Sequence, residues 1–142
     1  KSLVEINLLP LVGCEKLEEL WLSGNQPRRA VLAPIKSLKL LALDRNRLTK
    51  IDLSPLSGCK KLEKLFLSHN QLEHIDLSPL SSLKNLKSLT LQHNNLKKID
   101  LSPVAHIRGL VIEADCHAKL YGANVELVMR NIFFRFCKYR VI

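Results

Sequence analysis

The sequence predicts an α/β solenoid, in which one short strand and one short helical turn recur along the chain. The first observation is the phrase Leu-x-x-Leu-x-Leu-x-x-Asn, which begins at Leu17 and then returns at Leu38, Leu62 and Leu86. The second is a proline with the same spacing, which a long helix would not tolerate. The third is the alternation of leucines within each phrase, which places them on one side of a strand.

Two ladders of residues set the register of the repeat. The asparagines advance in steps of 21, 24 and 24 residues, and a further step of 21 reaches an aspartate: Asn25, Asn46, Asn70, Asn94 and Asp115. The prolines follow a compatible spacing: Pro10, Pro34, Pro55, Pro79 and Pro103. Two of the repeats are three residues shorter than the others, and both lose these residues between the proline and the asparagine. The repeat therefore tolerates a change of length in that segment.

Each part of a repeat has an expected structural role. The amide of the asparagine both donates and accepts hydrogen bonds, so we expect a buried column that satisfies backbone groups in the turns above and below it. Asp115 only accepts when ionised, which suits the last position of this structural ladder. The serine before the proline is expected to be the N-cap of a helical turn that has proline at its first position: Ser54, Ser78 and Ser102.

The repeated phrases resemble those of the leucine-rich repeat family. They read LEELWLSGN, LKLLALDRN, LEKLFLSHN and LKSLTLQHN, with IRGLVIEAD as a degenerate fifth copy, and the resemblance covers about residues 3–117. It implies a curved parallel sheet on a concave side and short helical turns on a convex side. It also implies a rigid recognition scaffold, which in this family often stands beside a second domain with a signalling or enzymatic activity.

We expect residues 1–117 to form about five repeats and residues 118–142 to form a C-terminal capping segment. A solenoid exposes the leucines of its last coil, so a cap has to cover them. Apolar residues with helical spacing predict a helix for this purpose: Val125, Val128, Met129, Ile132, Phe133 and Phe136. A basic amphipathic helix for a membrane or a partner is the alternative. Because the chain starts at Lys1 inside a repeat-like phrase, we expect it to be a piece of a larger protein.

The sequence predicts a partner-binding surface on the concave sheet. Positions three and five of each phrase point away from the leucine core, and there they place Trp21, Leu40 and Phe66. Exposed aromatic and aliphatic groups surrounded by charge are typical of contact sites, and tryptophan is frequent among hot-spot residues. Four charged residues are expected to set the register of the partner: Glu19, Asp44, Arg45 and Lys64. The alternative is that another part of the same chain covers Trp21.

His69 and His93 lie on adjacent predicted strands and belong to the same surface. They would respond to pH or hold a metal, but two histidines without a cysteine or carboxylate in the right column make a poor zinc site. We therefore expect solvated histidines and no metal. The sequence also has no glycine-rich phosphate loop, no G-x-S-x-G and no H-E-x-x-H, so we expect no catalytic residues, no cofactor and no enzymatic activity.

A formal net charge of +9 raises the alternative of nucleic-acid or anionic-membrane binding, through the basic surface and the basic C-terminal segment. The lysines and arginines are mixed with leucines in the sequence, and we do not expect them to align into one stripe. No stretch approaches the length of a membrane span. The prediction is therefore a scaffold that binds another protein, with neither nucleic acid nor a membrane as its partner.

Cysteine usage favours a cytoplasmic location. Cys14 and Cys59 occupy the same place in two repeats that lie two strands, or about 10 Å, apart, which is too far for a disulfide. The sequence has no N-x-S/T sequon and lacks the four-cysteine capping pattern of secreted family members. Free thiols are typical of a reducing compartment.

Overall fold

The computed structural model describes residues 4–115, 117–122 and 132–136. Its elements, in chain order, are β1 (Glu5–Asn7), η1 (Leu9–Leu11), β2 (Glu19–Trp21), β3 (Arg29–Val31), β4 (Leu40–Ala42), η2 (Ser54–Gly58), β5 (Lys64–Phe66), η3 (Ser78–Leu80), β6 (Ser88–Thr90), β7 (Lys98–Asp100), η4 (Ser102–Val104), β8 (Leu110–Ala114), β9 (Lys119–Tyr121) and β10 (Ile132–Phe136). The η elements are 3-10 helices.

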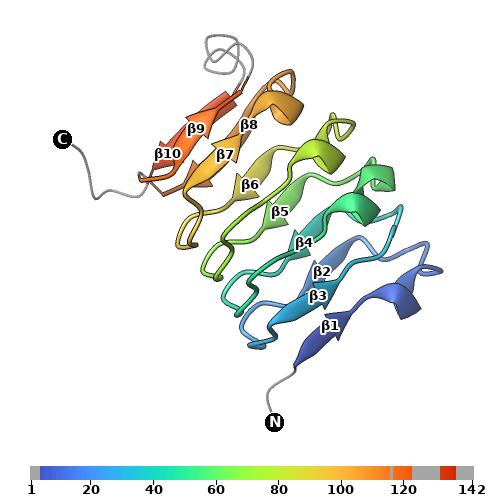
Figure 1. Ribbon diagram of the computed structural model, residues 1–142. Coiled ribbons are helices and arrows are strands. Elements are labelled where there is room, and N and C mark those ends of the chain that lie inside the picture. The colour runs from blue at the N-terminus through green and yellow to red at the C-terminus, as the bar shows by residue number, and fades with distance from the viewer. Residues whose placement is uncertain (1–3, 116, 123–131, 137–142) are drawn as a thin grey trace.

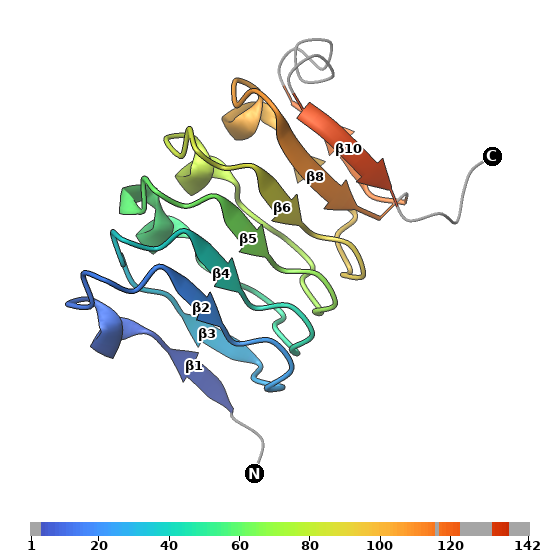
Figure 2. The same cartoon turned by 180° about the vertical axis from the view of Figure 1, so that it is seen from behind.

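The chain winds as a solenoid, and each repeat forms one coil. The main sheet has six parallel strands in the order β10-β8-β6-β5-β4-β2. Two smaller parallel pairs, β1 with β3 and β7 with β9, lie on the other side and are called the outer strands below (Figure 1). Seen from behind, the main sheet lies in front and the 3-10 turns gather along one edge of it (Figure 2). The predicted solenoid of parallel strands and short helical turns is confirmed.

A single hydrophobic core runs between the main sheet and the outer strands. The middle residue of each main strand points into it, as Leu41, Leu65 and Leu89 do, and all three are fully buried. Cys59 is also fully buried and free, and burial raises the pKa of its thiol. The core is continuous from coil to coil because each coil supplies the same apolar positions to its neighbours.

Aspartate, not serine, caps the 3-10 turns. The residue before each helix is a leucine, and no side chain caps at that position. Two residues upstream of the serine, an aspartate Oδ1 accepts the serine backbone N–H at 2.9 Å, in the pairs Asp52–Ser54, Asp76–Ser78 and Asp100–Ser102. The serine hydroxyl and N–H also hold the pKa of Asp52 and of Asp76 below the ordinary value. The expected serine N-cap is therefore wrong, because these turns start one residue earlier than expected, so that the serine is the first residue of the turn and the leucine before it takes the cap position.

The ladder residues connect each coil to the one before it. Asn70 is buried; its Nδ2 donates to the carbonyls of Leu67 in its own coil and Leu43 in the preceding coil, and its Oδ1 accepts the N–H of Leu48. Asn94 repeats this pattern with Leu91, Leu67 and Leu72. We expected each asparagine to bond backbone groups in the coils before and after it. Instead, Asn70 and Asn94 bond backbone groups of their own coil and of the preceding coil.

The ladder is modified at both ends. Pro27 stands where Leu48 stands in the next coil, and proline has no backbone N–H to donate. The Oδ1 of Asn46 therefore accepts hydrogen bonds from the backbone N–H groups of Asn25 and Gln26 instead. Asp115 accepts the N–H groups of His93 and Asn94. Asn25 is exposed and donates to carbonyls within its own turn. A carboxylate suffices at Asp115 because two donors face it.

Two expectations about the end of the repeats are wrong. Residues 132–136 form strand β10 rather than part of a helix, since Ile-Phe-Phe-Arg-Phe is rich in strand-forming residues and the edge of β8 offers unpaired backbone groups. The other residues of the expected helix, Val125, Val128 and Met129, lie outside the described residues. The fifth repeat is also shifted by two residues: Ser88 pairs with Val111 and Thr90 with Glu113, where Gly109 and Val111 were expected. Gly109, at φ 76°, redirects the chain just before β8.

Replacing Asn70 by alanine is expected to destabilise the fold by about 3 kcal/mol. The change leaves the Leu48 backbone N–H without its partner inside the core, and it removes one of the two amide donors from each of the Leu43 and Leu67 carbonyls. Asn25→Ala is the matched control, because its side chain is exposed, and we expect it to cost less than about 1 kcal/mol. Urea unfolding followed by far-ultraviolet circular dichroism measures both, and equal losses in the two variants would contradict the role of the ladder.

Candidate functional site

The candidate site is the exposed face of the main sheet. The pairing of the strands aligns the outward residues into two columns that cross the coils. The first contains Glu19, Leu40, Lys64, Ser88 and Val111, and the second contains Trp21, Ala42, Phe66, Thr90 and Glu113. The columns thus bring together the predicted residues Trp21 and Phe66, and place Glu19 and Lys64 on either side of Leu40.

Trp21 and Phe66 form an aromatic pair across Ala42. They lie two strands apart, on β2 and β5, with Ala42 of β4 directly between them in the register. Their ring centroids are 6.4 Å apart with the planes tilted by 55°. Ala42 is fully buried although it points to the outer side of the sheet, because the rings close over its small side chain. Trp21 itself remains 60% exposed.

Leu40 is not exposed. Its side chain is only 6% accessible, so the expectation that it presents an aliphatic surface to a partner is wrong. The register places it between Glu19 and Lys64, two long side chains on neighbouring strands about 4.8 Å away. Leu40 therefore belongs to the support of the surface rather than to its exposed area.

Polar side chains on this face are held by hydrogen bonds within the chain. Trp21 Nε1 donates to Glu19 Oε2 at 3.0 Å, which fixes the indole ring. The Ser23 hydroxyl donates to Asp44 Oδ1 at 2.6 Å, and Gln92 Nε2 donates to Glu113 Oε2 at 2.8 Å. Sequence reasoning missed Glu113 as a site residue, because its column depends on the two-residue shift of the fifth repeat.

A row of left-handed residues borders the main sheet, one position before the ladder. Arg45, His69 and His93 have φ values of 56°, 53° and 59°, and Gly24 takes the same position in the first coil with φ 75°. Left-handed backbone is unusual outside glycine, and here it turns the chain toward the buried asparagine. Arg45 Nε lies 3.9 Å from Asp44 Oδ2. The predicted residues Asp44, Arg45, His69 and His93 thus lie together at one border of the site.

The two histidine rings stack on each other. Their centroids are 4.2 Å apart and the planes differ by 23°. Partial burial, the neighbouring His93 and then Arg45 lower the pKa of His69, and the carboxylates of Asp44 and Asp115 oppose the shift. Stacked rings do not converge on a point between them, and no group of three or more potential metal ligands occurs among the described residues.

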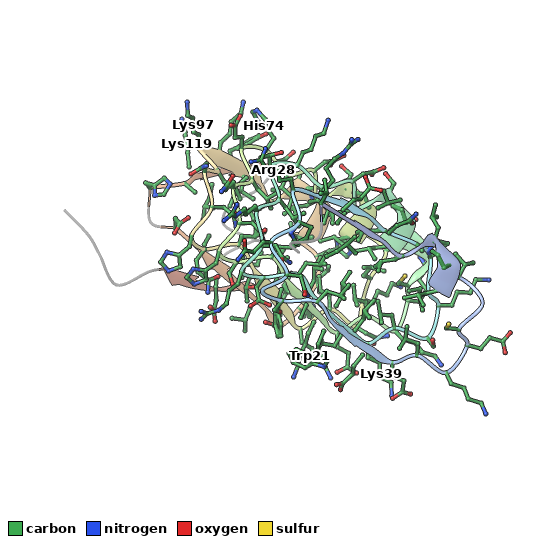
Figure 3. The ribbon with its side chains drawn as sticks, turned by 90° about the horizontal axis from the view of Figure 1, so that it is seen from below. Trp21, Arg28, Lys39, His74, Lys97 and Lys119 are labelled. Carbon is green, nitrogen blue, oxygen red and sulfur yellow. The ribbon has the colours of Figure 1, made fainter. Side chains whose placement is uncertain are left out.

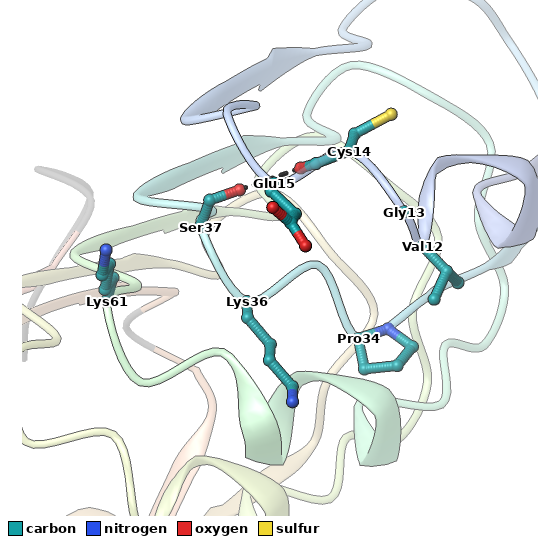
Figure 4. Close-up of a pocket in the computed structure, with 8 residues that line it drawn as sticks. All are labelled: Val12, Gly13, Cys14, Glu15, Pro34, Lys36, Ser37 and Lys61. Carbon is teal, nitrogen blue, oxygen red and sulfur yellow. Dashed lines mark hydrogen bonds between the residues drawn. The ribbon is translucent and has the colours of Figure 1, made fainter.

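One hollow lies away from this face, between the turns of successive coils. It has a volume of about 480 Å³, and Figure 4 shows its eight lining residues, which come from the first three coils. Cys14 is half-buried and free, and its backbone carbonyl accepts a hydrogen bond from the Ser37 hydroxyl at 3.1 Å. Glu15, Lys36 and Lys61 supply one carboxylate and two ammonium groups. Sequence reasoning did not find this hollow, because it depends on the packing of three turns.

Comparison with known proteins agrees with the geometry. Residues 36–102 match the model of the family described as leucine rich repeat. The chain therefore contains leucine-rich repeats and has the fold of a leucine-rich-repeat solenoid. No curated protein sequence matches it.

Three solved structures with leucine-rich-repeat folds are similar to this chain, all from Listeria monocytogenes. Internalin C2 is 25% identical with a TM-score of 0.63, and the match covers 93% of this chain and 66% of that one. The internalin inlF is 22% identical with a TM-score of 0.53, covering 88% and 44%. The functional domain of InlJ is 19% identical with a TM-score of 0.59, covering 94% and 32%. This chain spans less than two thirds of the length of each.

Leucine-rich-repeat domains are common protein-interaction scaffolds, and folds of this kind are typically not enzymes. In residues 4–115, 117–122 and 132–136, no helix has the length and apolar character needed to cross a bilayer. The exposed face of the main sheet is therefore a candidate for binding rather than for catalysis.

Lowering the pH from about 7 to 5 is expected to destabilise the protein through His69. Its folded pKa lies below the ordinary value of 6.5, so the unfolded chain takes up the proton first. The free energy of unfolding is therefore at its full value above pH 6.5 and decreases as the pH falls below 6.5. In His69→Asn, which keeps a residue that tolerates left-handed backbone, urea unfolding at the two pH values should show a smaller difference than in the wild type.

The control for this measurement is His74→Asn, which removes an exposed histidine that lies outside the stacked pair. Only the His69 variant should reduce the pH dependence. If the stability of His69→Asn changes with pH as much as that of the wild type, the pH dependence does not come from His69.

Proposed function

We propose that this protein binds a partner protein on the exposed face of the main sheet, the concave face of the solenoid, with Trp21 and Phe66 as its anchor. The observation that carries this proposal is a tryptophan that is 60% exposed and yet fixed in place. Its ring contacts Phe66, and its N–H is bonded to Glu19. Large exposed apolar groups of this kind supply most of the binding free energy in protein interfaces.

The surface is preorganised for binding. A partner that covers Trp21 leaves no indole N–H unpaired, because Glu19 already accepts it. The rings of Trp21 and Phe66 lose little conformational freedom on binding, since each already restricts the other. Short β-strands in a continuous sheet hold the backbone, so binding requires no ordering of a loop.

Charged residues around the anchor give the partner its orientation. Lys64 is exposed and has no ion pair among the described residues, so it is available to a carboxylate of the partner. Arg45 is exposed beside Asp44, and the stacked face of His69 and His93 continues this border. Pairs at the rim of an interface contribute more to specificity and to the rate of association than to affinity. Leu40 acts by supporting Glu19 and Lys64 rather than by direct contact.

The proposal includes no chemistry of the protein's own. The two columns carry one serine and one threonine, and the border beside them carries Asp44 and the stacked histidines. Among the described residues of this face these groups do not form the nucleophile, base and orienting group that a catalytic site needs. We accordingly propose a scaffold without a cofactor. The free thiols of Cys14 and Cys59 support a cytoplasmic location, which is part of the same proposal.

Replacing Trp21 and Phe66 together by alanine should weaken partner binding by about 2–4 kcal/mol, because the change removes the exposed anchor and leaves the leucine core intact. The partner is captured from a lysate of the native cell with the wild-type chain and identified by mass spectrometry. Isothermal titration with the purified partner then gives the dissociation constants.

Tyr121→Ala is the matched control, since it removes an exposed aromatic ring from the outer strands. Circular dichroism establishes that each variant is folded. A partner that binds the folded double variant with wild-type affinity would refute the anchor, and a loss of affinity only in the control would place the binding face on the outer strands.

A further inference from the structure

One outward position on the outer side of the solenoid carries a basic residue in five consecutive coils. The position lies four residues after each ladder residue and directly before a residue that points into the core. It is occupied by Arg29, Lys50, His74, Lys98 and Lys119, which we call the basic column. Strand pairing places Lys98 directly beside Lys119, and Arg29 lies on β3. The sequence-based expectation that the basic residues form no stripe is therefore wrong.

The basic column is exposed and lies opposite the candidate protein-binding face. All five side chains are exposed, and Arg28 and Lys97 extend the column by one residue in two coils. Figure 3 shows Arg28, His74, Lys97 and Lys119 on one side of the molecule, with Trp21 and Lys39 on the other. At about 4.8 Å from coil to coil, the column is about 20 Å long.

The charges of this column are largely free to meet a ligand. Within the described part of the chain, its one ion pair joins Arg29 Nε to Glu5 Oε2 at 4.0 Å, and both side chains are exposed. Lys98 Nζ lies 5.7 Å from the ring centroid of Tyr121, which is itself exposed. Two shallow hollows of about 340 and 310 Å³ lie along the column, one beside Arg29 and Lys50 and one beside His74 and Lys97.

A row of carboxylates limits the width of the ligand. Asp52, Asp76 and Asp100 lie two residues beyond the column in three of the coils, about 7 Å away along the extended chain, and an oxygen of each accepts the serine N–H of its own turn. A bilayer or a duplex would extend over both rows, and the carboxylates would repel it. A single polyanionic strand that follows the basic column avoids them. Tyr121, at one end, adds a ring on which a base can stack.

We propose that the basic column binds the phosphate backbone of single-stranded nucleic acid, which runs across the coils along the solenoid. This second surface is independent of the protein-binding face. The four arginine and lysine side chains of the column give a slope of about −2.8 in a plot of log affinity against log salt, since each charged contact on a single strand contributes about −0.7. The affinity therefore falls about fiftyfold between 50 and 200 mM salt.

The test is fluorescence anisotropy of a labelled 20-nucleotide thymidine oligomer with the full chain, at several salt concentrations. The variant K50E/K98E/K119E reverses three charges of the column. The control K60E/K61E/K84E makes the same change of net charge at exposed positions in the turns that precede β5 and β6, outside the column. We expect the first variant to lose at least tenfold in affinity and to flatten the salt slope by about 2, and the control to lose less than threefold.

A third variant, Tyr121→Ala, separates nucleic acid from other polyanions. It should weaken binding of the oligomer several-fold without changing the binding of inorganic polyphosphate. Equal losses in the two charge variants, or no binding at 50 mM salt, overturn the proposal. It is also overturned if polyglutamate or heparin displaces the oligomer at equal charge concentration, or if phosphatidylserine vesicles bind as tightly, because the surface would then serve an acidic protein, a sulfated polysaccharide or a membrane.

Discussion

The buried asparagine that follows each of β4, β5 and β6 is the interaction on which the structure depends. One amide satisfies carbonyls of two successive coils and an N–H of the preceding coil, in a place that water does not reach. Without it, the turn would bury several unpaired backbone groups. The left-handed residue just before it turns the chain so that this side chain enters the core. Each coil thereby fixes its predecessor, and stability becomes a sum of contacts between neighbours.

The same constraint produces both candidate surfaces. Since the coils are held in register at the ladder residues, positions at a fixed distance from those residues line up across the solenoid, except on the main sheet at β8, where the register is shifted by two residues. Trp21 and Phe66 precede their asparagines by four residues, and the basic column follows them by four. Insertions of three residues fall elsewhere in the repeat and leave these rows aligned. The fold thus converts a spacing in the sequence into a spacing of about 4.8 Å in space.

The sequence predicted the features that depend on local pattern and missed those that depend on neighbours. The buried leucines follow from alternation. The burial of Leu40 does not, because it depends on long side chains from two adjacent strands. The prediction of a helix was wrong for residues 132–136, because these residues pair as a strand with the edge of β8. The basic column was not predicted, because its members are 21 or 24 residues apart in the sequence and become neighbours only in the folded solenoid.

The exposure of Trp21 has a cause that separates it from the other residues of its column. β2 is the edge strand of the described main sheet, so side chains on only one side of Trp21 belong to that sheet. Ala42 is too small to cover the indole, and Phe66 reaches it only by crossing the alanine. A larger residue at position 42 would bury part of the indole but would force the two rings apart. The small residue therefore produces both the aromatic contact and the exposure, and these two properties together make the pair a rigid apolar feature on an otherwise polar face.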